Sequence, residues 1–174
     1  MHVLVATDGE LETAAAADFA ATLAGPDGRV TVLTVVEIPR AFLNDVRSHW
    51  ATEDGPSVVA DYTYVETPKA HQEGPTGWPG DDALIERYLG DKLHQNTSPL
   101  VRALKERGVD TDARVVESEN VAPAIIDHLL DLDAEVLVIG SHGQGLFQGL
   151  LGSTGTKIVR RSPRPVLLLR TATP

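Results

Sequence analysis

The residues with the clearest chemical potential lie in a glycine-rich segment, Gly140 to Gly155, which reads GSHGQGLFQGLLGSTG. It follows an apolar run, EVLVI, and leads into a segment with a helical pattern. Glycines let the backbone approach a ligand without a Cβ in the way. The start of a helix presents unpaired N–H groups and a partial positive charge, and Ser153 and Thr154 add hydroxyl donors. The pattern therefore predicts a phosphate site that needs no lysine.

The segment matches neither of the two common nucleotide-binding signatures. The Walker pattern requires Gly-Lys-Ser/Thr, and no such lysine stands between Gly152 and Ser153. The dinucleotide fingerprint belongs directly after the first strand, where this chain reads Asp8-Gly9-Glu10. A phosphate site here would therefore belong to another class.

The surrounding sequence alternates strand-like and helix-like segments. Apolar, β-rich runs occupy 2–7, 29–36, 112–116, 135–139 and 165–170, and helical patterns occupy 11–23, 81–107, 121–132 and 153–160. Strands separated by helices need crossover connections, which favours a parallel sheet. We predict an α/β fold with an open, mainly parallel, five-stranded sheet and helices on both faces. Ligands of such sheets bind at the carboxyl ends of the strands, where the strand order reverses. Asp8 and Gly140 are expected to meet there.

The region from 40 to 80 interrupts this alternation. It contains four prolines and many glycine and acidic residues, and it sustains no helical or strand period. We interpret it as an irregular insertion in a single domain spanning 1–174, with a short helix near 42–50. Pro99 falls inside the helical pattern of 81–107, where a proline can kink or break a helix.

Composition excludes several kinds of chemistry. The chain has no cysteine, which excludes disulfides, thiolate metal sites and cysteine nucleophiles. A formal net charge of −10 opposes binding to nucleic acid and to anionic membranes. The histidines are scattered without metal-ligand spacing, and no paired carboxylates are evident, so we assign no metal ligand and no catalytic residue. No signal peptide or membrane span is recognisable, so the expected location is the cytoplasm.

With these motifs in view, the chain resembles the universal stress protein family, whose fold is Rossmann-like. The resemblance rests on five pieces that together span most of the chain: Thr7-Asp8-Gly9, Val32–Val36, Gly140-Ser141-His142-Gly143, Leu150–Ser153 and Ile158–Arg170. In ATP-binding members the loop reads Gly, two residues, Gly, nine residues, Gly, then Ser or Thr. Only eight residues separate Gly143 from Gly152 here, so the loop is one residue short.

The resemblance implies an adenine nucleotide ligand, ATP or else AMP or ADP, with Mg²⁺ as an accompanying ion. It directs Asp8 to the ribose or to the metal-phosphate end, and Val35 to the adenine through its backbone. It directs a set of small residues to the ribose and phosphates: Gly140, Gly143, Gly152, Ser153 and Thr154. It also implies a homodimer formed through the last strand, Val166–Arg170, an apolar edge of the kind that pairs with another chain.

Three functions remain open at this point. The first is a nucleotide-binding regulatory or stress-response protein that acts through occupancy. The second is a slow ATPase or autophosphorylating enzyme, with Ser153, Thr154 or His142 as acceptor. The third is a nucleotide-free dimeric interaction module, which the shortened loop favours. His142 could touch phosphate or act as a base, and the alternative is a solvated loop residue.

Overall fold

The computed structural model describes residues 1–38, 81–141 and 152–170. The chain divides into two compact units, one formed by Met1–Glu37 with Tyr88–Pro174 and the other by Ile38–Arg87. The architecture below is that of the first unit. The short helix expected near 42–50 lies outside the described residues, and the interpretation of 1–174 as one domain with an insertion stays a prediction.

Five parallel strands form the sheet: β1 (His2–Ala6), β2 (Arg29–Val36), β3 (Asp110–Glu117), β4 (Val136–Ser141) and β5 (Val166–Arg170). Their order is β3-β2-β1-β4-β5. The chain therefore moves outward from β1 in one direction and then returns to place β4 on the other side of β1. This confirms the predicted open parallel sheet and puts the reversal of strand order between β1 and β4.

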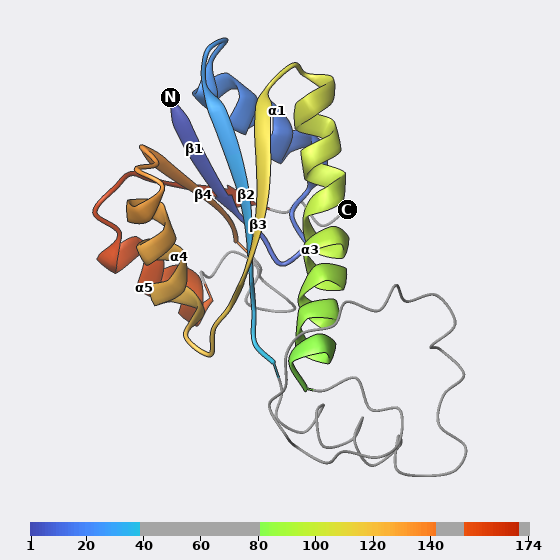
Figure 1. Cartoon of the computed structure of the whole chain (residues 1–174). Helices are drawn as coiled ribbons and strands as arrows, with labels where there is room; N and C mark the ends of the chain where they lie inside the picture. Colours follow the sequence, from blue (N-terminus) through green and yellow to red (C-terminus); the bar gives the residue numbers. More distant parts are fainter. Residues whose placement is uncertain (39–80, 142–151, 171–174) are drawn as a thin grey trace. The chain divides into compact units, whose positions relative to one another are not determined.

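Helices cover both faces of this sheet, as predicted: α1 (Thr13–Ala24), α3 (Asp81–Glu106), α4 (Val121–Asp131) and α5 (Ser153–Arg161). In Figure 1, α4 and α5 lie together on the side of the sheet opposite α1. Val3 and Val5 belong to a core cluster with α1 and α3, whereas Leu4 and Ala6 belong to a second cluster with α4 and α5. Burial on both faces explains why the central strands β1 and β4 are almost continuously apolar.

Pro99 does not break α3, which continues as one helix from Asp81 to Glu106. A proline removes the hydrogen bond that its own N–H would have made one turn back, and its ring crowds the carbonyl there, so other interactions must offset this cost. Leu100 and Leu104, which follow it, are 4% and 0% exposed in the core. Their burial holds the second half of α3 against the sheet, because each buried leucine contributes about 1.5–3 kcal/mol.

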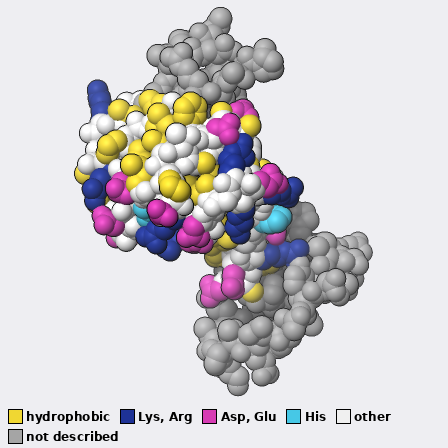
Figure 2. All heavy atoms as spheres, turned by 90° about the horizontal axis from the view of Figure 1, so that it is seen from above, with side chains coloured by type: hydrophobic (Ala, Val, Ile, Leu, Met, Phe, Trp, Pro, Cys, Tyr) yellow, Lys and Arg dark blue, Asp and Glu magenta, His cyan; other side chains and the backbone are white. Residues whose placement is uncertain are grey.

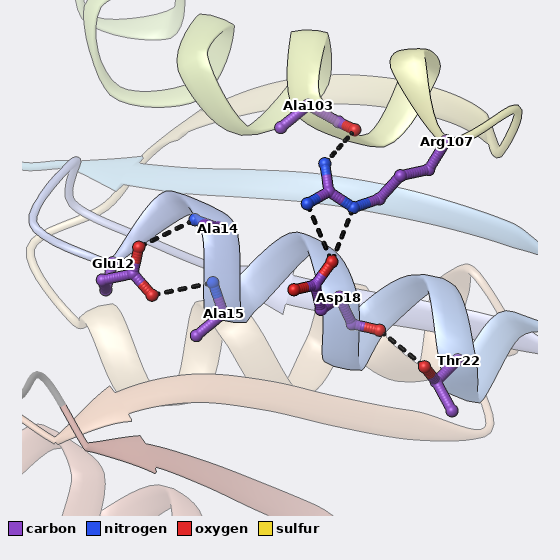
Figure 3. Close-up of polar contacts among 7 residues, drawn as sticks. All are labelled: Glu12, Ala14, Ala15, Asp18, Thr22, Ala103 and Arg107. Atoms are coloured by element: carbon purple, nitrogen blue, oxygen red, sulfur yellow. Dashed lines mark hydrogen bonds and ion pairs between the residues drawn. The ribbon is translucent and has the colours of Figure 1, made fainter.

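The N-terminus of α1 is capped by Glu12, whose two carboxylate oxygens accept from Ala14 N at 3.0 Å and Ala15 N at 2.7 Å (Figure 3). A carboxylate at this position also interacts favourably with the helix dipole. Asp8 is therefore not the helix cap that its place after β1 allowed. It forms a turn instead, in which its Oδ1 accepts from Glu10 N at 3.1 Å.

An ion pair joins the end of α3 to the middle of α1. Arg107 directs two guanidinium nitrogens at Oδ1 of Asp18, each at 2.8 Å, and a third nitrogen donates to Ala103 O (Figure 3). Asp18 is largely exposed, so the pair fixes geometry more than it adds stability.

His2, at the amino end of β1, is a buried core histidine. Its side chain is only 7% exposed. Nδ1 lies 3.0 Å from Leu132 O and Nε2 lies 2.9 Å from Thr31 Oγ1. These contacts suit a neutral ring that donates to the carbonyl and accepts from the hydroxyl. Burial lowers the pKa of His2 below its ordinary value of 6.5.

A pH dependence of stability follows from His2. The folded protein binds this proton more weakly than the unfolded chain, so the stabilisation is complete above about pH 6.5 and is lost as the pH falls towards the lower folded-state pKa. We expect His2→Gln to flatten the rise in unfolding free energy between about pH 5 and 8, measured by urea denaturation. His94→Gln, at an exposed position on α3, is the matched control. A slope equal to that of wild type in His2→Gln would contradict the assignment.

Candidate functional site

The candidate site lies where β1 and β4 end side by side. The two strands pair in parallel with Ala6 opposite Ile139, so Asp8 and Gly140 leave the same edge of the sheet from neighbouring strands. The strand order reverses between these strands. Open parallel sheets bind their ligands at such a point, outside the carboxyl ends of the strands.

The loop from β1 to α1 is held by hydrogen bonds within itself. Gly9 N donates to Thr7 Oγ1 at 2.9 Å, and Glu10 N donates to Asp8 Oδ1 at 3.1 Å. Gly9 has a φ of +97°, a conformation that favours glycine over any residue with a Cβ. The loop therefore presents the exposed Asp8 carboxylate from a defined backbone at the edge of the sheet.

Val35 lies near the carboxyl end of β2, on the sheet face that α4 and α5 cover. It packs against the cluster that contains Leu33 and Ile158, and it pairs in register with Val116 of β3. Its side chain is half-buried. Because β2 neighbours β1, the backbone of Val35 lies along the same edge as Asp8.

The N-terminus of α5 points to this same edge. At its other end, Arg164 Nη2 bonds Asp133 Oδ1 at 2.8 Å, close to the start of β4 and thus at the amino edge of the sheet. The helix therefore runs back from the carboxyl edge, where Ser153 begins it. Gly152 is the N-cap and Thr156 N donates to its carbonyl at 2.9 Å, whereas no side chain of the described residues caps the helix.

Gly152 is a glycine that the fold itself does not require. Its φ is −59°, which any residue can adopt, and a Cβ built there would meet nothing within 4 Å in the described parts of the chain. None of the described residues would therefore collide with a side chain's Cβ at this N-cap. Ser153 is exposed and Thr154 half-buried at this helix start.

Two of the expected site residues, His142 and Gly143, lie outside the described residues, as does most of the shortened loop. Gly140 lies within β4 and pairs with Leu169 of β5. The structure therefore brings Asp8, Gly140 and the start of α5 to one edge, with Val35 on the adjacent strand, and leaves the roles of all the site residues as predictions.

The arginines near the C-terminus of α5 do not belong to this site. Arg160 and Arg161 occupy the last turn, about 10–12 Å along the helix from Ser153. They lie at the negative end of the helix dipole, where cations are favoured on their own account. Figure 2 shows the molecule from the top of Figure 1. On the face in view, hydrophobic side chains gather in one part, and charged side chains of both signs are interspersed elsewhere.

Metal ligation and membrane insertion find no support among the described residues. No group of three or more histidine, aspartate or glutamate side chains is arranged to hold a metal ion there. In the same part of the chain, no helix combines the length and hydrophobicity that crossing a bilayer demands.

Sequence reasoning missed Asn96, a polar residue on α3 that reaches the end of β2. Its Nδ2 donates to Thr34 Oγ1 at 3.0 Å, and Thr34 is fully buried. The available signal was its place in the apolar stripe of the helix, one turn before Leu100. A polar residue at such a position must find a buried partner.

Comparison with known proteins assigns the family. The sequence profile of the Universal stress protein family matches residues 1–170. The structure is similar to that of hypothetical protein MJ0577, at 17% identity and a TM-score of 0.61, over 99% of this chain and 97% of that one. A universal stress protein from Archaeoglobus fulgidus has 17% identity, a TM-score of 0.59 and 97% coverage of both chains.

A universal stress protein family member from Arabidopsis thaliana, At3g01520, was solved with AMP bound. It is 14% identical, with a TM-score of 0.55 over 99% of this chain and 93% of that one. Comparison with curated protein sequences gives no match. Identities at this level establish a shared fold, and the profile match covers nearly the whole chain. The chain therefore belongs to the universal stress protein family.

Proposed function

We propose that this protein binds an adenine nucleotide at the carboxyl ends of β1 and β4. The observation that carries the proposal is the start of α5, which has a glycine without a side chain as its N-cap and lies at the carboxyl edge of the sheet, where the strand order reverses. Amides at a helix start favour anionic oxygens through both hydrogen bonding and the helix dipole. Such a local device also allows an anion to bind to a protein with a net charge of −10.

The proposed contacts follow the geometry of the edge. The amides and hydroxyls of Ser153 and Thr154 receive the phosphate, and Asp8 on the neighbouring strand accepts from ribose hydroxyls. Val35 meets the adenine through its backbone, one strand further along. The resemblance adds Gly140 and Gly143 to the ribose and phosphate contacts. His142 lies between them in the sequence, and we propose that its ring contacts the phosphate.

Ligands of related structures support an adenine nucleotide as the class of ligand. Proteins of the same fold have been solved with AMP, with dAMP and with cAMP. These three molecules share adenine and one phosphate. Our finer proposal is ATP with Mg²⁺ as the physiological ligand. We propose a regulatory role in which occupancy, and not turnover, carries the signal.

Calorimetry of the purified chain tests the proposal. We expect ATP, ADP and AMP to bind, with GTP as the control for the base, and we expect an adenine nucleotide to appear by mass spectrometry in protein prepared without added ligand. Titration with and without Mg²⁺ separates the ion's contribution. No binding of any adenine nucleotide at millimolar concentration would refute the proposal.

We also propose a homodimer formed through β5. This strand ends the described sheet and pairs with β4 on one side. Leu168, at its midpoint, is 39% exposed, which is unusual for a leucine in an otherwise buried sheet. An apolar strand at the edge of a sheet favours pairing with a second copy about a two-fold axis.

A further inference from the structure

Three elements meet at the side chain of Asn96. Asn96 belongs to α3, Thr34 to β2, and Gly9 to the loop after β1. The Asn96 amide donates from Nδ2 to Thr34 Oγ1 at 3.0 Å. Its Oδ1 faces Gly9, where an ideal Cβ would stand only 3.2 Å from this oxygen and 3.4 Å from the Asn96 Cα. A side chain at position 9 would therefore press against Asn96, so α3 and the loop approach each other closely at this glycine.

The hydroxyl of Thr34 fixes the orientation of the Asn96 side-chain amide. Thr34 is 0% exposed, so its hydroxyl has no access to solvent, and its bond to Asn96 links the helix to the sheet. A buried hydroxyl or amide that loses its partner destabilises the fold. The amide plane of Asn96 is therefore held in one orientation with its oxygen turned towards Gly9.

The loop after β1, which Asn96 approaches at Gly9, carries a residue of the proposed site. Gly9 directly follows Asp8, and the φ of +97° at Gly9 sets the direction in which the chain leaves the carboxylate. The loop's own bonds, from Gly9 N to Thr7 Oγ1 and from Glu10 N to Asp8 Oδ1, determine its shape. A bond from Thr7 N to Leu33 O at 2.9 Å ties the start of the loop to β2, and Leu11 at its end packs in the core cluster that includes Leu100 of α3. The close approach of Asn96 adds a constraint from α3 at Gly9 itself.

We propose that Asn96, anchored by Thr34, is a positioning residue that holds the Asp8–Gly9 loop in the arrangement that binds the nucleotide. The inference rests on the proposed nucleotide site and adds a residue from a helix that contributes no ligand contact of its own. A loop that is already placed loses less conformational freedom when the ligand binds, which raises affinity.

Two substitutions at Thr34 separate the hydrogen bond from simple packing. Thr34→Val keeps the shape and removes the hydroxyl, and Thr34→Ser keeps the hydroxyl and removes a buried methyl. We expect Thr34→Val and Asn96→Ala to weaken AMP binding about fivefold to tenfold in calorimetry. We expect Thr34→Ser to bind within about twofold of wild type while losing stability to urea, because a buried methyl leaves a void. All three variants are then expected to lose stability, and only Thr34→Val and Asn96→Ala to lose affinity.

Nitrogen-15 amide spectra of the nucleotide-free proteins give a second readout. Asn96→Ala should shift or broaden the amide signals of Gly9 and Glu10. Gln95→Ala, an exposed neighbour on the same helix, should change neither these signals nor the affinity for AMP. Wild-type affinity in Asn96→Ala, or equal losses in Thr34→Val and Thr34→Ser, would overturn the positioning role and leave the nucleotide site standing. A wild-type protein that binds no AMP would instead refute the nucleotide site, and the positioning role with it.

Discussion

A Gly152→Val variant should bind AMP and ATP about ten- to a hundredfold more weakly than the wild-type protein while unfolding at the same urea concentration. The fold tolerates a Cβ here as far as the described residues go, because none of their atoms lies within 4 Å of it and the φ of −59° is ordinary. If phosphate oxygens bind to the first amides of α5, the methyl groups of the valine at position 152 would displace them. Hydrogen bonds to a charged group contribute about 1.5–3 kcal/mol each, which sets the size of the loss.

Gly152→Ala should show a smaller loss, since one methyl group intrudes less than three carbons. The matched control is Gly90→Val on α3, another glycine at which a Cβ would meet nothing within 4 Å. We expect that variant to retain its affinity for nucleotide. Full binding by Gly152→Val would mean that the phosphate does not approach this helix start, and the proposed site would need another location.

Leu168→Lys should convert the proposed dimer to a monomer at micromolar concentration, as measured by light scattering after size exclusion. Leu168 is the middle residue of β5, so an antiparallel pairing centred on this strand brings the two copies of residue 168 close together. Each substitution then occurs twice at one interface, where two buried like charges cost several kcal/mol. The loss in association should therefore exceed a hundredfold, a factor that corresponds to about 2.8 kcal/mol.

The same substitution at an exposed leucine elsewhere provides the control. Leu130 of α4 is 48% exposed and lies outside β5, so Leu130→Lys should remain dimeric. Nucleotide affinity measured in parallel tests whether the Leu168→Lys protein is still folded. A Leu168→Lys protein that still eluted as a dimer would show that a different surface joins the copies.

The alternation of segment types was enough to predict the sheet, because apolar strands joined by helical crossovers have few other arrangements. It was also enough to place Asp8 and Gly140 at one edge, since parallel strands share a direction. The cap of α1 was less predictable, because aspartate is the commoner cap and the longer Glu12 side chain reaches the amides only through a particular backbone geometry. The continuity of α3 through Pro99 depends on tertiary burial of Leu100 and Leu104, which local propensity does not contain.

The candidate site shows the same division between local and long-range information. The helix start at Gly152-Ser153 follows from small residues next to each other in the sequence. Asn96 does not, because its partners Thr34 and Gly9 are 62 and 87 residues away along the chain and only the fold brings them together. His142 and Gly143 lie outside the described residues, so their predicted roles remain predictions.

The position of β1 has a consequence for how the protein is made. The strand nearest the start of the sequence is the middle strand of the finished sheet, with β2 on one side and β4 on the other. A ribosome releases β1, α1 and β2 early, and these can associate while synthesis continues. One flank of β1 nevertheless stays uncovered until Val136–Ser141 has emerged, more than a hundred residues later. Nascent chains halted before that point would expose a bare apolar strand edge, the kind of surface on which chaperones act.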